Sequence, residues 1–286
     1  MDILSTRGFD DYSLIDSGNG RRLEQFGKYI ISRPDPQAIW KPLKNEDFWQ
    51  KADAVYVQNG RKGYWDKNSV PEKWTLKYKG LKFYCRLTPF KHTGVFPEQS
   101  LNWEFMEKIL EKAGRQANIL NLFGYTGAST LVAAGAGSKV THVDASKPSI
   151  TWAKENQEAS GLSEKPVRWI LDDAVKFVKR EIKRGVRYDG IIMDPPVYGH
   201  GPEGEVWDFN RSFPELVGLC RQVLSENPHF FIVNAYAVSA SSIMLVNVVN
   251  DFCKNLGGNT EYGELALKEE ETERLLSTGI FARWSA

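Results

Sequence analysis

The sequence predicts an α/β protein in which a small β-rich domain precedes a parallel sheet with a reversed terminal strand. From Pro97 onward, short apolar runs alternate with segments of helical periodicity. Residues 1 to about 88 instead read as short extended segments separated by turns rich in Gly and Pro. The 286 residues, 42% of them hydrophobic and 26% charged, exclude a disordered, fibrous or collagen-like chain. We therefore predict a β-rich accessory domain at 1–88 and a second domain at 89–286.

In the first domain, YSLIDSGNGRRLEQFGKYIISR places an SGNG turn between extended segments, and the Pro-rich RPDPQAIWKP ends that unit. A second hairpin is expected at about 74–88. In the second domain, LNWEFMEKILEKAG predicts a helix with an apolar face. The remaining predicted elements alternate strand and helix: NILNLFG, STLVAAGAG, KVTHVDA, SITWAKENQEASG, VRWIL, DAVKFVKREIKRG, YDGIIMD, FPELVGLCRQVL and HFFIVNAY. ELALKEE and GIFARWSA predict a terminal pair of strands.

Composition narrows the cellular setting. The three cysteines form no CxxC pair and no disulfide framework, so a reducing compartment is the simplest interpretation. The four histidines are scattered, which predicts no metal site. The N-terminus does not resemble a signal peptide, and the longest apolar runs are too short to span a bilayer. We expect a cytoplasmic protein that binds no membrane.

Charge is divided unevenly along the chain. Residues 1–91 carry 17 Lys and Arg against 11 Asp and Glu, whereas residues 92–286 carry 20 against 25. The run 61–91 alone holds nine basic and two acidic side chains, interleaved with aromatic rings. Cations suit phosphates and rings suit bases, so one hypothesis is an RNA-binding surface. The other is a solvated hairpin whose lysines protect an edge strand.

The first turn from strand to helix, Phe123-Gly124-Tyr125-Thr126-Gly127, lets a ligand approach the backbone near a helix N-terminus. Asp144 ends the next strand, twenty residues after Gly124, where a carboxylate can accept hydrogen bonds from both ribose hydroxyls. The glycines do not spell GxGxxG, which argues against a dinucleotide. The joint pattern favours an adenosine-containing cofactor. Taken singly, the glycines could serve a tight turn and Asp144 could cap the helix that begins near Lys147.

Two further strand ends carry polar residues. Asp172 and Asp173 follow the third strand; one can bind an adenine amine while the other, for which Asp172 fits well, caps the next helix. Asp194-Pro195-Pro196 follows the fourth strand and is the most specific signal in the chain. Two prolines after an acid predict a rigid extended loop whose carbonyls can accept a substrate amine, with Tyr198 placed to stack on a planar base. The simpler alternative is a plain turn.

These motifs together resemble the class I S-adenosylmethionine-dependent methyltransferases, with their Rossmann-like sheet. More narrowly they resemble the family that includes the 23S ribosomal RNA cytosine-C5 and guanine-N7 methyltransferases. The likeness rests on NLFGYTG, VDAS, DDA and DPP in this order, on HTGVFPEQ and WAKEN, and covers about 89–286. Residues 1–88 are similar to the shorter β-rich module of some family members, not to a PUA domain.

The resemblance implies a set of site residues. Those implied to bind S-adenosylmethionine are Phe96, Gln99, Phe123, Gly124, Tyr125, Thr126, Gly127, Asp144, Ala145, Ser146, Asp172, Asp173, Ala174 and Asp194. Those implied to act on the substrate are Asp194, Pro195, Pro196, Tyr198 and Asn234. The product would be S-adenosylhomocysteine, and the partner RNA, in particular ribosomal RNA.

Two departures from the family pattern matter. Pro97-Glu98-Gln99-Ser100 lacks the arginine that relatives carry in this segment. Asn234 stands where the cytosine-C5 enzymes place a nucleophilic cysteine, and the cysteines here lie elsewhere. The sequence therefore predicts methylation of a ribosomal RNA base without a cysteine nucleophile, closer to the guanine-N7 branch. Two alternatives stay open: a methyltransferase for a small molecule or protein, and an RNA-binding protein with a vestigial cofactor pocket.

Overall fold

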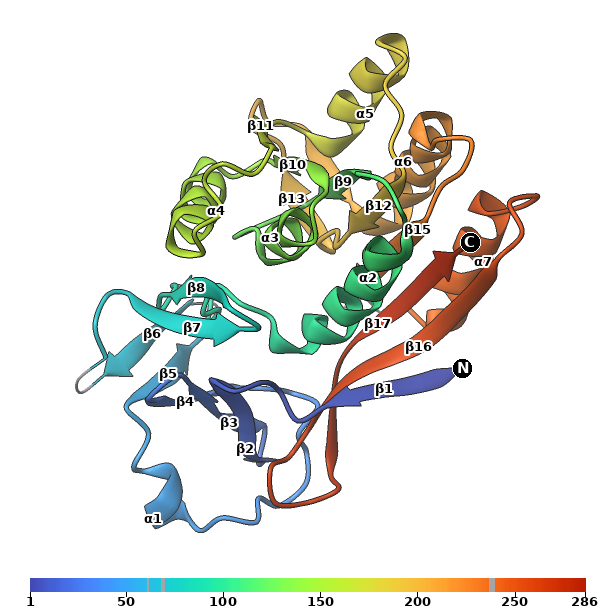
Figure 1. Ribbon diagram of the computed structural model, residues 1–286. Coiled ribbons are helices and arrows are strands. Elements are labelled where there is room, and N and C mark those ends of the chain that lie inside the picture. Colours follow the sequence, from blue (N-terminus) through green and yellow to red (C-terminus); the bar gives the residue numbers. More distant parts are fainter. Residues whose placement is uncertain (61, 68–69, 237–239) are drawn as a thin grey trace. The chain divides into compact units, whose positions relative to one another are not determined.

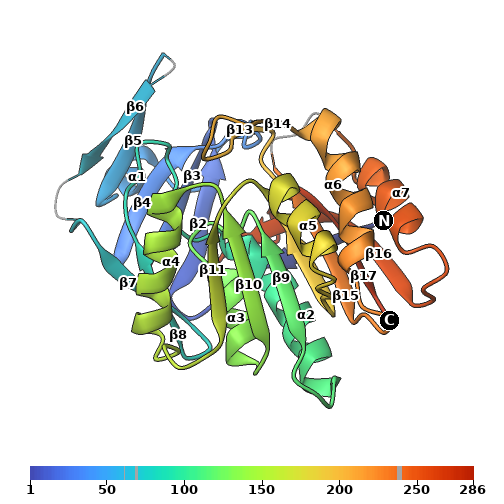
Figure 2. The same cartoon turned by 90° about the horizontal axis from the view of Figure 1, so that it is seen from above.

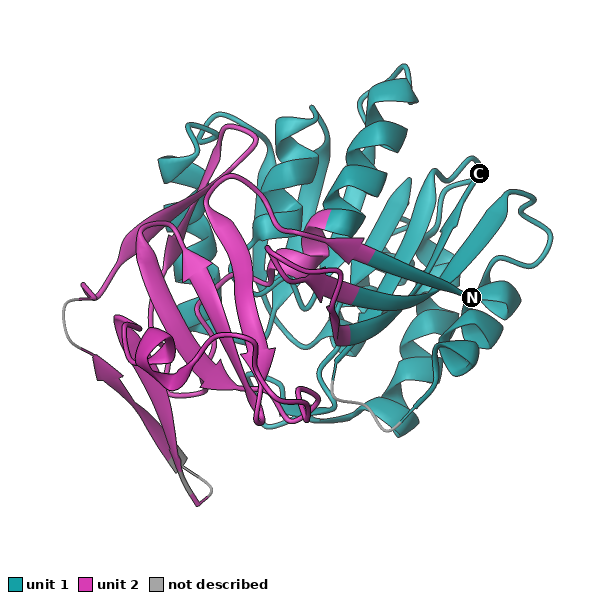
Figure 3. Ribbon diagram, turned by 90° about the horizontal axis from the view of Figure 1, so that it is seen from below, with its two compact units in different colours: residues 1–4, 101–265, 279–286 teal, residues 5–100, 266–278 magenta. Residues whose placement is uncertain are grey.

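The computed structural model describes residues 1–60, 62–67, 70–236 and 240–286. Packing divides them into two compact units (Figure 3). The sheet unit comprises Met1–Leu4, Leu101–Leu265 and Gly279–Ala286, and the N-terminal unit comprises Ser5–Ser100 and Ala266–Thr278. The second unit therefore combines the start of the chain with a segment close to its end. The predicted domain boundary at residues 88 and 89 stays a prediction.

An eight-stranded sheet organises the larger unit (Figure 1). Its strands, in order across the sheet, are β1 (Asp2–Thr6), β16 (Asn259–Lys268), β17 (Leu275–Ser285), β15 (Phe230–Ala235), β12 (Gly190–Met193), β9 (Asn118–Leu122), β10 (Lys139–Asp144) and β11 (Val167–Leu171). The five strands from β15 to β11 are parallel, and β17 runs antiparallel to β15. This confirms the parallel sheet with a reversed terminal strand. The strand order reverses between β9 and β12, the point at which open α/β sheets bind ligands.

Helices cover both faces of this sheet (Figure 2). They are α2 (Ser100–Lys112), α3 (Ala128–Gly135), α4 (Lys147–Ala159), α5 (Ala174–Lys183), α6 (Phe209–Val223) and α7 (Ser242–Phe252). The apolar sides of α5, α6 and α7 form one continuous core with alternate residues of the strands, including Leu122, Met193 and Val233. α6 begins four residues before the predicted Phe213, because the Asp208 carboxylate caps it by accepting from the Arg211 backbone N–H at 3.1 Å.

The N-terminal unit contains a five-stranded sheet and a separate two-stranded ribbon. The sheet strands are β2 (Tyr12–Gly18), β3 (Arg21–Phe26), β4 (Tyr29–Pro34), β5 (Ala54–Asn59) and β6 (Lys62–Lys67), with the short α1 (Glu46–Trp49) between β4 and β5. The ribbon pairs β7 (Trp74–Tyr78) with β8 (Leu81–Cys85), which confirms the predicted second hairpin. The SGNG turn joins β2 to β3, with positive φ at Asn19 and Gly20. β5 and β6 form an antiparallel hairpin that we did not predict from the sequence, although Asn59-Gly60 at the end of β5 is a hairpin signal.

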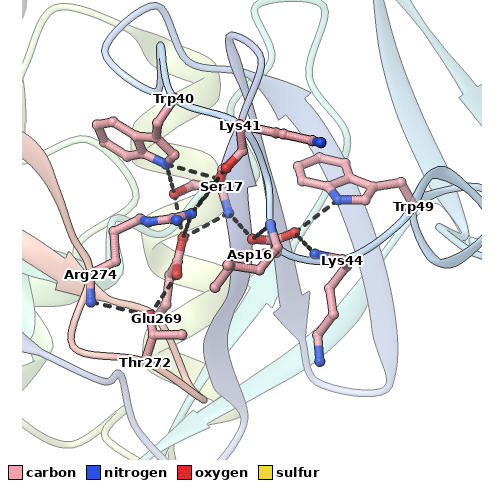
Figure 4. Close-up of polar contacts among 10 residues, drawn as sticks. Asp16, Ser17, Trp40, Lys41, Lys44, Trp49, Glu269, Thr272 and Arg274 are labelled. Carbon is pink, nitrogen blue, oxygen red and sulfur yellow. Dashed lines mark hydrogen bonds and ion pairs between the residues drawn. The ribbon is translucent and has the colours of Figure 1, made fainter.

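A polar network ties the connection between β16 and β17 to the N-terminal strands of this unit (Figure 4). The buried Asp16 carboxylate accepts the indole N–H of Trp49 at 3.0 Å, together with three backbone N–H groups. The buried Glu269 carboxylate accepts both the hydroxyl and the backbone N–H of Ser17 and is paired with Arg274. Both carboxylates are fully partnered, so the network holds the fold together and offers no vacant ligand position.

No helix among the described residues is long and apolar enough to cross a membrane. Within the same residues, no group of three or more His, Cys, Asp or Glu side chains is arranged to hold a metal ion.

Candidate active site

The glycine turn after β9 adopts a backbone shape that only a specific sequence can sustain. Phe123, Tyr125 and Gly127 all have positive φ, at 56°, 48° and 84°. A Cβ atom on Gly127 would lie 2.9 Å from the Cβ of Ala153 on α4. One on Gly124 would lie 2.4 Å from the ring of His142. Both glycines are therefore required by contacts within the protein, and the same turn leads into the N-terminus of α3.

A buried polar network lies beneath this turn. The His142 ring is fully buried and its Nδ1 lies 2.9 Å from the hydroxyl of Thr130, which also accepts from the Asn121 side-chain amide at 2.8 Å. Burial lowers the pKa of His142 to about 3, so the ring is neutral at physiological pH. Asn156, from the predicted WAKEN segment, donates to the Thr126 carbonyl at 2.9 Å. Side chains from β9, β10, α3 and α4 thus hold the turn in place.

Asp144 reaches from the end of β10 to the same turn. One carboxylate oxygen accepts the Tyr125 backbone N–H at 2.8 Å and the other accepts the Ser146 N–H at 2.8 Å. Burial raises the pKa of Asp144, although both hydrogen bonds oppose the rise. The helix cap is Ser146, whose hydroxyl accepts from the Ser149 N–H, so the alternative that Asp144 caps α4 is wrong. A carboxylate has about four acceptor positions, which leaves Asp144 able to accept from a ligand.

Of the two acids after β11, the one that caps the next helix is not the one for which the sequence argued. Asp173, not Asp172, caps α5, because its carboxylate accepts the Lys176 N–H at 2.8 Å. Asp172 instead accepts the Asp173 N–H at 2.9 Å and forms an ion pair with Arg180. Ala174 begins α5 and is buried. The contact of either acid with adenine stays a prediction.

The Asp194-Pro195-Pro196 loop follows β12 and leads into a small hairpin, β13 (Tyr198–His200) and β14 (Val206–Asp208). The expectation that both proline carbonyls are open to a substrate is wrong for Pro196, whose carbonyl accepts the indole N–H of Trp207 at 2.6 Å. Pro195 is buried, whereas the Tyr198 ring is 58% exposed and lies edge-on to His200. Trp207, to which the sequence assigned no role, therefore holds the loop through the Pro196 carbonyl, and the Tyr198 ring stays accessible.

The strand register explains why these motifs belong together. Met193 lies beside Leu122 of β9 on one side and Val233 of β15 on the other. Leu122 lies beside Val143 of β10. The residues that follow these four positions lie at the carboxyl edge of the sheet, on either side of the point where strand order reverses. This arrangement can bind a nucleoside against the glycine turn and present a second, planar molecule to the DPP loop.

Comparison with known proteins agrees with this geometry. The family model described as "S-adenosylmethionine-dependent methyltransferase" matches residues 57–248. The chain belongs to that family. The solved S-adenosylmethionine-dependent methyltransferase from Agrobacterium tumefaciens is 43% identical to this methyltransferase, with a TM-score of 0.97 over 100% of this chain and 93% of that one. The cofactor of the enzyme is therefore S-adenosylmethionine, and the class I fold expected from the sequence is confirmed.

Curated relatives of the methyltransferase include ribosomal RNA large subunit methyltransferase K/L from two Shewanella species. The protein of Shewanella frigidimarina is 34% identical over 54% of this chain and 21% of its own length. The protein of Shewanella sp. strain MR-4 is 31% identical over 56% of this chain and 22% of its own length. The chain therefore spans about a fifth of the length of these relatives.

The other predicted site residues of the methyltransferase are distributed as follows. Asn234 lies in β15 and is 1% exposed, and its side-chain amide oxygen Oδ1 accepts from the side-chain Nδ2 of Asn102 in α2 at 2.9 Å. Arg283 of β17 also donates to Asn102, at 3.3 Å. Phe96 and Gln99 belong to the N-terminal unit, and Gln99 is buried there. Asn102 could not be found from the sequence, because nothing local marks it as the partner of a residue 132 positions away.

All three cysteines of the methyltransferase are buried, as expected for small apolar side chains. Burial raises the pKa of Cys253 to about 12 and those of Cys85 and Cys220 further above the usual thiol range. A thiol with a raised pKa is a poor nucleophile at neutral pH.

Proposed function

We propose that this methyltransferase transfers the methyl group of S-adenosylmethionine to a base of ribosomal RNA without a cysteine nucleophile. The main support for methyl transfer to a base is the position of the DPP loop. It lies at the carboxyl edge of the sheet next to the glycine turn, and the exposed Tyr198 ring follows it. The choice of RNA rests on the names of the curated relatives and on the excess of basic residues in the first 91 positions.

The cofactor fits the residues present. Gly124 and Gly127 let the turn pack closely on His142 and Ala153, and Asp144, held by Tyr125 and Ser146, offers a fixed acceptor for ribose hydroxyls. In this proposal Asp172 or Asp173 faces the adenine. S-adenosylmethionine supplies an already activated methyl group, so the remaining work of the protein is to position the acceptor atom.

The acceptor is proposed to lie over the DPP loop. Tyr198 offers a ring on which a base can stack, and Asp194 and Pro195 are the first two residues of the loop after β12. Trp207 holds the Pro196 carbonyl and so keeps the loop extended. The proposed role of Asn234 is to shape the acceptor side of the site through its bond to Asn102, in place of a nucleophile.

The function is tested by labelled methyl transfer to the total RNA and the total protein of a strain that lacks the gene. We expect label in large-subunit ribosomal RNA. Label only in protein or in small molecules would contradict the RNA assignment and favour the alternative substrate classes. A covalent adduct with RNA containing a fluorinated cytosine would contradict the absence of a cysteine nucleophile.

Asp144 gives a direct test of the cofactor site. Asp144→Ala should weaken S-adenosylmethionine binding by about 1–3 kcal/mol, the range for a lost hydrogen bond to a charged group. The same change also releases the Tyr125 and Ser146 N–H groups, and Asp144→Asn would place an amide NH2 against one of them, so thermal unfolding of the variant is measured beside its cofactor affinity. Calorimetry that shows unchanged affinity in the folded Asp144→Ala variant would remove Asp144 from the site.

A further inference from the structure

The β7–β8 ribbon of the N-terminal unit has one apolar face. Register places Trp74 opposite Cys85 and Leu76 opposite Phe83, and all four side chains are buried. The Trp74 indole N–H also donates to the Phe26 carbonyl of β3 at 3.0 Å. The ribbon is therefore anchored by this face and by a tryptophan to the five-stranded sheet. The fold fully accounts for these side chains.

The opposite face of the ribbon carries cations and one aromatic ring. Register places Lys77 opposite Lys82 and Thr75 opposite Tyr84. Lys77 and Lys82 are exposed, and Tyr84 is half-buried. The Lys73 ammonium lies 4.0 Å from the centroid of the Tyr84 ring. We call Lys73, Lys77, Lys82 and Tyr84 the lysine face.

Lys77 and Lys82 bring two cations to the same point of the ribbon, directly across from each other. The Asp11 carboxylate accepts the Lys77 backbone N–H at 2.9 Å, which places one acid beside this pair. A polyanion can bind such a face, because each ammonium can approach a phosphate. The N-terminal unit as folded, Ser5–Ser100 with Ala266–Thr278, holds 19 Lys and Arg against 15 Asp and Glu, so its net charge is positive as well.

We propose that the lysine face binds a single-stranded segment of RNA, an inference that rests on the proposed function and assigns its RNA-contacting surface. Lys77 and Lys82 bind phosphates, and the Tyr84 ring stacks on an unpaired base after the Lys73 ammonium, which lies over that ring in the free protein, moves to a phosphate. Residues two apart on a strand are separated by about 6.7 Å, so Lys82 and Tyr84 engage neighbouring parts of one strand. A base paired in a duplex cannot offer its face to a tyrosine, which is why the proposal specifies single-stranded RNA.

Not every lysine of the basic run 61–91 belongs to the lysine face. Lys79 lies in the turn of the ribbon at φ 43°, beyond the strand positions that face each other, with its ammonium 5.3 Å from the Tyr78 ring centroid. The Lys62 side chain, and residues 61 and 68–69 of the predicted basic run, lie outside what the structure describes. The cross-strand pair Lys77 and Lys82 is therefore the decisive one.

The charge test uses a 12-nucleotide oligouridine strand, with a 12-base-pair RNA duplex for comparison. Lys77→Ala/Lys82→Ala should weaken binding to the strand. It should also lower the slope of log affinity against log salt by about 1.4, since each phosphate contact contributes about 0.7 for single strands. Lys41→Ala/Lys51→Ala is the control: both lysines are exposed in the same unit, and the net charge changes equally. An equal loss in the control would mean that net charge, not the lysine face, binds RNA.

The stacking test uses the ring alone. Tyr84→Ala should weaken binding of the same strand about 5- to 150-fold, the equivalent of 1–3 kcal/mol for one stacked base, without changing the salt slope. Tyr84→Phe keeps the ring and should bind like wild type. Thermal unfolding of each variant establishes that it is folded. If Tyr84→Phe loses as much affinity as Tyr84→Ala, stacking is excluded.

Failure of this inference can be told apart from failure of the proposed function. If the wild type methylates ribosomal RNA and the double lysine variant binds the strand as tightly across the salt range, the lysines only protect a strand edge. The inference then falls and the function stands. If the lysine face binds RNA but label never enters RNA, the function falls and the RNA-binding surface stands. A wild type that neither binds nor methylates RNA overturns both.

Discussion

Gly124 is the position in the active site where one added methyl group has the best-defined consequence. A Cβ atom there would lie 2.4 Å from Cε1 and 2.5 Å from Nδ1 of His142, far inside a normal contact. The ring is fully buried, bonded to Thr130 at 2.9 Å, and packed against Trp169 with 4.7 Å between ring centroids. To reach an ordinary separation of about 3.5 Å, the imidazole must move by about 1 Å. We expect Gly124→Ala to break the bond to Thr130.

The size of the effect follows from these contacts. Overpacking a well-filled interior costs about 1–3 kcal/mol, and the lost hydrogen bond adds about 1 kcal/mol. The free energy of unfolding should therefore fall by about 2–4 kcal/mol. For a domain of this size, that loss lowers the melting temperature by roughly 5–15 °C.

Urea unfolding of Gly124→Ala is compared with that of Gly218→Ala. Gly218 is exposed within α6, and a Cβ there meets nothing within 4 Å, so alanine should stabilise the helix by about 0.5–1 kcal/mol. In a His142→Ala background the clash is absent, and adding Gly124→Ala should cost less than about 1 kcal/mol. The reasoning is refuted if Gly124→Ala is as stable as wild type, or if removing the ring recovers none of the loss.

Four further predictions follow from the structure. The triple Cys→Ser variant of the buried cysteines should still transfer methyl groups once folded, and complete loss of transfer in a folded variant would make a cysteine catalytic. Burial alone would raise the pKa of Glu24, but Arg22, Arg33 and two hydrogen bonds lower it to about 2, so its stabilising contribution is present above pH 4.5 and lost as the pH falls toward 2. Glu24→Gln should therefore cost about 3–5 kcal/mol at pH 7, with a difference from wild type that shrinks below pH 4.5 in acid titrations of unfolding. Asp16→Asn places an amide opposite several donors and should lower stability by about 2–4 kcal/mol in urea unfolding, whereas an unchanged midpoint would show that the charge is dispensable. Trp207→Phe should slow methyl transfer more than it weakens cofactor binding, and equal loss of both would mean that the indole supports the whole sheet edge.

The sequence by itself determined the alternation of strands and helices from α2 to β15 and the position of the glycine turn, but it did not predict β1 in the sheet, the β13–β14 hairpin or α7. The alternation and the turn both depend on short-range features: apolar periodicity sets each element, and Gly124, Gly127 and Asp144 lie within about twenty residues of one another. The terminal pair of strands followed from the same pattern, whereas the reversed strand was implied by the family resemblance and is seen in the antiparallel pairing of β17 with β15. The β7–β8 hairpin could also be predicted, because apolar and polar residues alternate along both of its strands.

Tertiary structure decided the partners of individual polar atoms. Whether Asp172 or Asp173 caps α5 depends on one residue of backbone register, which propensity alone does not fix. The Pro196 carbonyl is taken by Trp207 only because the β13–β14 hairpin folds the chain back on itself. Asn234 meets Asn102 only once β15 is covered by α2. Gly124 is required by His142 of the neighbouring strand, a contact that exists only once the sheet is assembled. Periodicity is a local property of a sequence. Hydrogen-bond partners and close contacts instead depend on which distant side chains the fold brings together.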